Sequence, residues 1–279
     1  MICRRTFLSC AAASVALPRW AFAAPSRLTL SGSLAEGGLV VGKTEPGSVL
    51  TLDGAPLNIG PSGDFVFGLT YDQTKPAVLA ATFKDGTTET RNVVPVARQY
   101  EIQRINGLPE KMVTPPPDVL ERRKREIASI AEARKHVTDA AWFAEPFDWP
   151  IAGIVSEPYG GQRILNGEPR APHLAMDIAN AAGTPIRAPA PGLVSLAGPD
   201  FYLEGGLTIL DHGQGVSTCY LHQSKQLVKV GDKVERGATI GLVGMTGRAT
   251  GPHLHWGLNW FQMALDPSLS TRTPLPAKV

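Results

Sequence analysis

Cysteine is scarce in this 279-residue chain, which has only Cys3, Cys10 and Cys219. The first two lie in a segment with a basic start, an Ala-rich middle and an Ala21-Phe22-Ala23 cleavage signature, which predicts a signal peptide over residues 1–23. Its removal leaves Cys219 alone, so no intrachain disulfide can form. An exported chain without disulfides must be stabilised by its core or by a metal.

Charge imbalance and long apolar runs are also missing. The chain has 27 Lys+Arg against 25 Asp+Glu, and loss of the signal removes three arginines and no acidic residue. The formal charge thereby changes from +2 to −1, which does not indicate nucleic acid or a membrane surface as a partner. No later apolar run approaches the length of a membrane span, so we expect no integral membrane segment after signal cleavage.

The signal itself is of a particular type. Arg4-Arg5-Thr6-Phe7-Leu8 resembles a twin-arginine export motif, with Cys3 where the usual pattern prefers Ser. Arg19, close to the cleavage site, suits the same route. An ordinary secretory signal is the alternative. Either route predicts a periplasmic or otherwise exported protein.

The rest of the chain is predicted to be mainly β. Over residues 24–104, short candidate strands are separated by turn pairs such as Asp53-Gly54 and Asp85-Gly86. Phe65, Phe67 and Leu69 alternate, as half-buried strands require. We expect a small β-sandwich here, with no reactive constellation and an unknown role, most simply that of a spacer or adaptor.

Residues 105–146 are predicted to be a Pro-rich linker followed by a helix. Pro115 to Pro117 stiffen the linker, and Asp118 can cap a helix that runs to about Val137. One face of this helix is marked at helical spacing and is most simply a packing face: Leu120, Ile127, Ile130, Ala131 and Arg134. The run 122–125 of basic residues fits a solvated face with internal ion pairs; a patch for anionic wall polymers is the alternative.

Residues 147–268 hold five of the six histidines, and residues 269–279 form a C-terminal tail. In "GPHLHW", His253 and His255 share one face of a strand, about 6.6 Å apart, while Leu254 and Trp256 face the core. The pattern of His173 and Asp177 offers a nitrogen and an oxygen ligand, a mixture that zinc accepts. On a straight strand these two would lie about 13 Å apart, so the chain must curve or coil between them.

Three motifs occur in order: "HLAMD" at 173–177, "YLH" at 220–222 and "GPHLHW" at 251–256. Together with the flanking "WPIAGIVSEPYGGQR" and "GTPIRAPAPGLV", they resemble the lysostaphin-type (LytM-like) zinc metallopeptidases over residues 147–268. The resemblance implies an antiparallel β catalytic domain. The sequence departs from the family pattern at Ala175, where glycine is usual.

The resemblance also implies residue roles. His173, Asp177 and His255 would bind Zn²⁺, and His222 and His253 would act on the substrate. Arg163 matches the family's arginine near the rim of the cleft. Tyr220 alternates with His222 and could face the same cleft or satisfy the core. We interpret His212, beside a glycine turn, as a structural residue.

The function implied is a zinc-dependent endopeptidase that hydrolyses peptide crosslinks of peptidoglycan, with the D-alanyl–diaminopimelate bond as the expected target. Oligoglycine bridges are a second possible substrate. A different class also exists in the family, namely metal-free proteins that activate cell-wall amidases. Those proteins lose ligands, whereas all five site residues are present here.

The export motif yields a first prediction. Changing Arg4 and Arg5 together to lysine is expected to trap the precursor in the cytoplasm, because the twin-arginine route reads that pair. Cell fractionation and immunoblotting of the precursor and mature forms measure this. Normal periplasmic accumulation of the double variant would instead assign the chain to the general secretory route.

Overall fold

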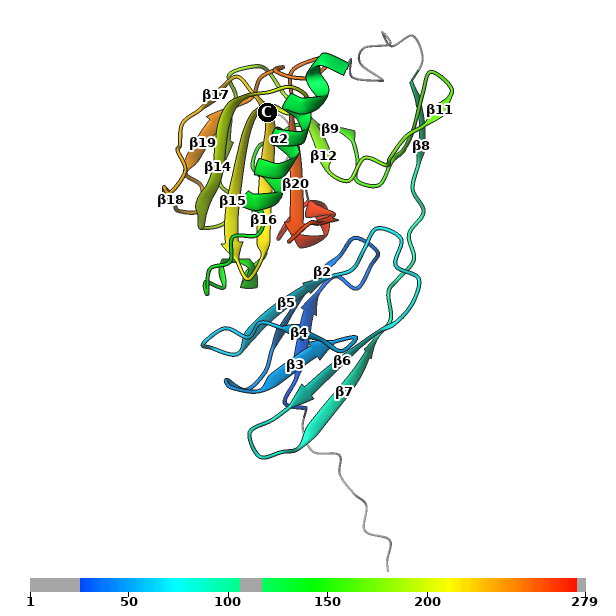
Figure 1. Cartoon of the computed structure of the whole chain (residues 1–279), viewed down its shortest axis with the longest axis vertical. Coiled ribbons are helices and arrows are strands. Elements are labelled where there is room, and N and C mark those ends of the chain that lie inside the picture. Colours follow the sequence, from blue (N-terminus) through cyan, green and yellow to red (C-terminus); the bar gives the residue numbers. More distant parts are fainter. Residues whose placement is uncertain (1–25, 106–116, 275–279) are drawn as a thin grey trace, which may run out of the picture.

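The structure is a computed structural model that describes residues 26–105 and 117–274. The expected signal peptide and the linker before Pro117 lie outside the described residues. Two bodies of β-structure are stacked along the long axis, and one helix, α2 (Pro117–Ala133), lies against the C-terminal body (Figure 1). The prediction of a mainly β chain with one helix is confirmed.

The N-terminal body consists of two antiparallel sheets. One has the order β1–β2–β5 and the other β4–β3–β6–β7. Their strands are β1 (Thr29–Gly32), β2 (Leu39–Lys43), β3 (Val49–Leu52), β4 (Ala55–Leu57), β5 (Asp64–Gly68), β6 (Ala77–Thr82) and β7 (Thr88–Val93). Phe65 and Phe67 are fully buried between the sheets, as their alternation predicts. Asp53 and Gly54 both have positive φ, which suits the tight turn that joins β3 to β4.

The C-terminal body is built on one large antiparallel sheet of order β18–β14–β15–β16–β20–β12–β9, with β21 paired to β20. Its strands are β9 (Ile154–Glu157), β12 (Met176–Ala179), β14 (Gly192–Phe201), β15 (Gly205–Gly213), β16 (Val216–Gln223), β18 (Lys233–Val234), β20 (His253–Trp260) and β21 (Met263–Leu265). A small sheet of β13 (Pro185–Arg187), β19 (Thr239–Leu242) and β17 (Lys225–Gln226) lies beside it. Two 3₁₀ turns, Trp142–Ala144 and Pro267–Ser270, complete the body.

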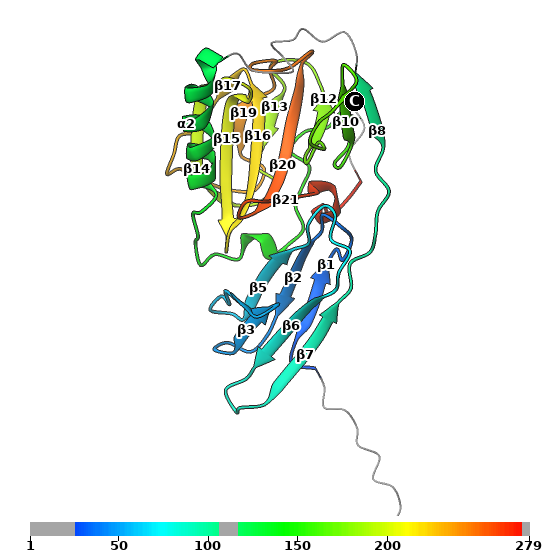
Figure 2. The same cartoon turned by 45° about the vertical axis from the view of Figure 1, so that its right-hand side comes forward.

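One strand connects the two bodies. β8 (Ile102–Ile105) pairs in parallel with β10 (Gln162–Leu165), which also pairs with β11 (Glu168–Pro169). Figure 2 shows β8 running from the sandwich along the edge of the C-terminal body. A second connection is an apolar cluster in which Leu39 and Val66 of the sandwich meet Val216 and Leu258 of the large sheet. The division of the chain at 104, 146 and 268 remains a prediction.

Helix α2 is attached to the β14–β15 hairpin by charge. Arg122 contacts Asp200, and Arg123 contacts both Glu126 and Glu204. Arg122 and Arg123 of the basic run are therefore paired, in part across to the sheet rather than only within the helix. The helix ends at Ala133, a few residues before the expected Val137. No helix within the described ranges has both the length and the apolar character that a bilayer span requires.

Two residues of the sequence analysis lie in the core. His212 is fully buried; its ring nitrogens lie 2.7 Å from the Pro191 carbonyl oxygen and 2.7 Å from Thr218 Oγ1. Thr218 Oγ1 is in turn 2.7 Å from the hydroxyl of Tyr220, which has no exposed surface. The structural interpretation of His212 fits this chain of hydrogen bonds, and Tyr220 satisfies the core instead of facing a cleft.

His212 yields a prediction for stability. Burial lowers its pKa from 6.5 to about 4, so the folded state keeps it neutral while the unfolded state takes up a proton as the pH falls below 6.5. The free energy of unfolding should therefore fall by about 3 kcal/mol between pH 6.5 and 4 on account of this residue, and level off below pH 4.

Urea unfolding of the wild type and of His212→Gln over this pH range isolates the effect. The variant is expected to be less stable at pH 7 but to lose less stability on acidification. Parallel pH profiles for the two proteins would show that His212 does not titrate in this way.

Candidate metal centre and active site

The candidate ligands come from two paired strands and the loop before one of them. β12 and β20 are antiparallel with Asp177 directly opposite His255, so both side chains leave the same face of the sheet. His173 forms an isolated bridge with Gly161, and the chain bends before β12 begins at Met176. The bend brings the His173 ring back to Asp177, as the expected curvature requires. Ala175 lies in this bend without a positive φ, so it replaces glycine without strain.

Three donor atoms of these residues form a tight triangle. His173 Nε2 lies 3.1 Å from His255 Nδ1 and 3.3 Å from Asp177 Oδ1, and His255 Nδ1 lies 2.8 Å from the same oxygen. A single proton can satisfy only one of these contacts, whereas one cation satisfies all three. The separations are close to the ~3.3 Å between neighbouring ligand atoms of a tetrahedral ion bound at about 2.0 Å. The donor set therefore fits a divalent metal ion.

Electrostatic interactions within the triangle keep Asp177 negatively charged, which favours the binding of a cation. Burial raises the pKa of Asp177, but contacts with His173 and His255 lower it more, so this carboxylate stays ionised. The Glu157 carboxylate lies 3.4 Å from His173 Nδ1, on the side of the ring away from the triangle. A carboxylate on that side favours the ring orientation in which Nε2 points into the triangle.

A second pair of imidazoles lies beside the triangle. The ring centroids of His222 and His253 are 4.7 Å apart, and His253 Nε2 is 3.7 Å from Asp177 Oδ2. Nδ1 of His222 lies 2.8 Å from the Thr246 carbonyl oxygen, and Nδ1 of His253 lies 2.8 Å from the Gly251 carbonyl oxygen. A carbonyl oxygen only accepts, so each Nδ1 carries the hydrogen, and in the neutral imidazole the lone pair is on Nε2.

His222 reaches this position through a strained backbone. Tyr220 pairs with Trp256 on the core face of the sheet and Leu221 pairs with His255 on the site face, so strict alternation would turn His222 into the core. Instead His222 has φ of 62°, in the left-handed region, which breaks the alternation and brings its ring to His253. Such strain costs on the order of 1–3 kcal/mol and is found at functional sites. Tyr220 therefore does not share the cleft with His222. The expectation that it could was wrong, because the strand is not regular at His222.

Burial, and then the neighbouring His255, lower the pKa of His222 to about 4. The imidazole is therefore neutral near pH 7, and its Nε2 can accept a proton or a hydrogen bond.

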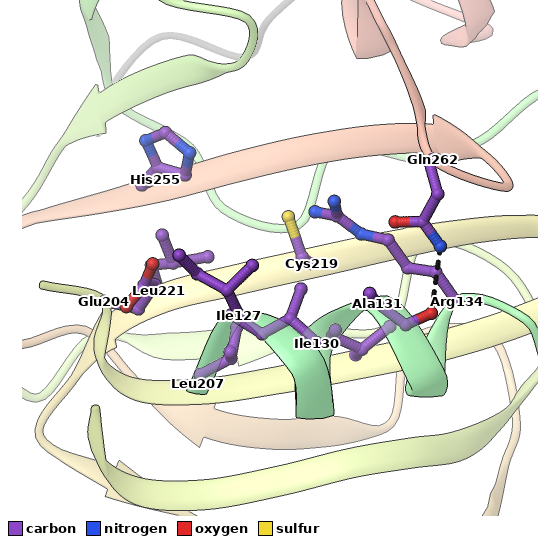
Figure 3. Close-up of a pocket in the computed structure, with 11 residues that line it drawn as sticks. Ile127, Ile130, Ala131, Arg134, Glu204, Leu207, Cys219, Leu221, His255 and Gln262 are labelled. Carbon is purple, nitrogen blue, oxygen red and sulfur yellow. Dashed lines mark hydrogen bonds between the residues drawn. The ribbon is translucent and has the colours of Figure 1, made fainter. Parts of the chain in front are cut away.

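A groove of about 330 Å³ extends from His255 between the sheet and α2. Figure 3 shows its floor, with Cys219 and Leu221 on β16, and its wall, with Ile127 and Ile130 on α2 and Arg134 directly after the helix. Helical spacing predicts a packing face here: Ile130 does pack on the cluster of Leu207, Ile209 and Cys219, whereas Ile127 is 55% exposed. The helical spacing identified the face; only the fold shows that it borders the site. The side chain of Arg163 lies outside the described residues, so its rim position remains untested.

An antiparallel sheet that presents two imidazoles and a carboxylate as metal donors, with two further imidazoles beside them, defines a metal-dependent hydrolase. The sequence comparison makes this specific. Residues 171–267 match peptidase family M23, and this part of the chain belongs to that family. The resemblance to lysostaphin-type metallopeptidases is thereby confirmed.

The names of individual curated relatives are consistent with this family. The chain is 48% identical over 88 residues to the peptidoglycan DD-endopeptidase ShyA of Vibrio cholerae, which covers 32% of this chain and 20% of ShyA. It is 38% identical over 122 residues to an uncharacterized metalloprotease of Haemophilus influenzae, covering 43% of this chain and 25% of that protein. The chain thus spans a quarter or less of these curated relatives.

A solved structure matches much more of the chain. The crystal structure of a Pseudomonas aeruginosa protein assigned to peptidase M23 superposes with a TM-score of 0.66 at 29% sequence identity. The match covers 85% of this chain and 94% of that protein. The sandwich and the metal-site sheet therefore occur together in another protein.

The triangle yields a prediction for metal content. Asp177→Ala and His255→Ala should each lose tight binding of a divalent ion, because two ligands hold zinc poorly, whereas His253→Ala should keep one ion per chain. Elemental analysis after dialysis measures the stoichiometry. His136→Ala, which removes an imidazole outside the triangle, is the control and should also keep one ion. Full metal retention by Asp177→Ala would contradict the assignment of this triangle.

Proposed function

We propose that the protein is an exported, zinc-dependent endopeptidase that hydrolyses peptide crosslinks of peptidoglycan, with the D-alanyl–diaminopimelate bond as its target. The observation that carries this proposal is the complete donor triangle beside two imidazoles whose Nε2 atoms keep lone pairs. The relative named as a peptidoglycan DD-endopeptidase supports the substrate class.

His173, Asp177 and His255 would hold the zinc ion. When bound, zinc polarises the scissile carbonyl and lowers the pKa of the attacking water. The Nε2 atoms of His222 and His253 are placed to accept the proton of that water, because their Nδ1 atoms are already committed to carbonyl oxygens. The imidazole that gains the proton can then donate it to the leaving amine. The two histidines share these tasks, since both face the same space beside Asp177.

The burial of the site suits this chemistry. His173 and Asp177 are 4% and 8% exposed, and His222 is 6% exposed, so polar interactions made there are weakly screened by water. His253 and His255 are more open and form the side that a peptide would approach. An activator of amidases without metal has no need of this ligand set, and the intact triangle therefore favours the enzyme.

Digestion of purified diaminopimelate-type sacculi by the zinc-loaded protein tests the proposal. Mass spectrometry should show loss of crosslinked dimers and gain of monomers cut between D-alanine and diaminopimelate. His253→Ala and His222→Ala should retain zinc yet lose about 10²–10⁴-fold in turnover, as general acid–base histidines do. His136→Ala should digest sacculi like the wild type.

Unchanged sacculi in the presence of bound zinc would reject the proposed activity. Cleavage of pentaglycine-bridged sacculi with sparing of the diaminopimelate type would instead establish oligoglycine as the substrate.

A further inference from the structure

The groove beside the metal centre contains a positive charge with no acidic partner. Arg134, at the end of α2, lines the groove, and Figure 3 shows its guanidinium beside the Cys219 sulfur. Within residues 26–105 and 117–274, its Nε is buried without a hydrogen-bond partner, and no carboxylate lies within ion-pair distance of it. The nearby acid, Glu204, already accepts hydrogen bonds of 2.6 Å and 3.0 Å from Arg123.

The Arg134 guanidinium contacts the neutral thiol of Cys219. Burial raises the pKa of the Cys219 thiol, so the sulfur stays protonated and does not compensate the charge. The groove lining also contains the apolar residues Ile130, Leu207 and Ile209 and, among polar groups, the neutral amide of Gln262. An arginine in such a place is costly to desolvate unless a ligand supplies the counter-charge. Its planar fork matches a carboxylate, which it binds through two parallel hydrogen bonds.

The register of the sheet shows how far Cys219, which lies beside the Arg134 guanidinium, is from the metal centre. Leu221 pairs with His255, and Cys219 pairs with Gly257, which is the next row on the same face. Rows two residues apart are separated by about 6.6–6.8 Å. Gly257 has no side chain, and the sulfur of Cys219 occupies the space above it, so the groove passes from His255 over this sulfur towards Arg134. A carboxylate bound at Arg134 would therefore lie only a few bonds from a carbonyl held at the metal centre.

We propose that Arg134 binds a substrate carboxylate adjacent to the scissile amide, and that it selects diaminopimelate-type crosslinks. This inference rests on the proposed endopeptidase function. In a D-alanyl–diaminopimelate crosslink, the carbon that bears the scissile nitrogen also carries a free carboxylate, and its aliphatic chain can pack on Leu221 and Ile127. An oligoglycine bridge offers no carboxylate at this distance and no aliphatic chain.

Two side-chain contacts fix the position of the helix that carries Arg134 at its end. Gln262 Nε2 donates to the Ala131 carbonyl oxygen across 2.9 Å, which ties the last turn of α2 to the turn between β20 and β21. Arg123 ties the middle of the helix to Glu204 at the other end of the groove. The guanidinium is thus presented by a helix fixed at two points rather than by a mobile loop, which lowers the entropy lost on binding.

The test uses two crosslinked dimer peptides that differ in one group. One has the free carboxylate on the diaminopimelate carbon beside the scissile nitrogen, and the other has a carboxamide there. The wild type should cleave the carboxylate peptide with a kcat/KM roughly 10–100-fold higher, as for hydrogen bonds to a charged group. Arg134→Gln should lose this preference by slowing only the carboxylate peptide, and Arg134→Lys should keep part of it.

Lys135→Gln is the matched control, because it removes one positive charge from the adjacent, exposed position. It should retain the full preference. Zinc content and melting temperature of all variants show whether the site and fold are intact. Equal cleavage of the two peptides by the wild type, or an unchanged preference in Arg134→Gln, would overturn the inference.

Calorimetry separates this inference from the proposed function. The probe is the amine-side cleavage product, as carboxylate and as carboxamide, added to the zinc-loaded wild type and to Arg134→Gln. Tighter binding of the carboxylate that disappears in Arg134→Gln supports the site even if neither dimer is cut, in which case only the proposed activity fails. Cleavage without any such difference in binding or rate rejects the role of Arg134 alone.

Discussion

The register between β12 and β20 is the constraint on which the rest of the site depends. It sets Asp177 opposite His255, and a slip of β12 by one residue would turn Asp177 towards the core face and away from His255. The core itself resists that slip, because Ile178, Leu254 and Trp256 are fully buried on the other face. Hydrophobic packing in the core therefore holds the Asp177 and His255 side chains next to each other on the site face. The core and the donor triangle lie on opposite faces of the same strands.

Backbone carbonyl oxygens orient the two imidazoles that lie outside the donor triangle. The Thr246 and Gly251 carbonyl oxygens lie in the loop before β20, and each accepts from an imidazole outside the donor triangle. These contacts fix the tautomer of each histidine, because a carbonyl oxygen can only accept the hydrogen carried by Nδ1. His173 differs from these two residues, because the Glu157 carboxylate lies 3.4 Å from its Nδ1.

Much of this arrangement could be predicted from the sequence. Alternation placed His253 and His255 on one face, and the distance along a straight strand showed that the chain must bend between His173 and Asp177. What could not be predicted was local. The left-handed conformation of His222 has no signature in "YLH", since neither glycine nor asparagine marks it. The position of Arg134 depends on contacts between α2 and a hairpin about 80 residues further along, such as that of Arg123 with Glu204, which helical spacing does not encode.

The helix α2 also has a consequence for how this protein could diversify. It ends at Ala133, whereas the family match begins at residue 171, so the groove wall and the metal site are contributed by separate stretches of the chain. Recombination upstream of the M23 domain could therefore exchange the wall while every donor atom stays in place. Selectivity and chemistry can evolve independently when they are encoded in different segments. A gene fragment for the metal-site sheet alone would carry the donor atoms into a new protein but leave this groove wall behind.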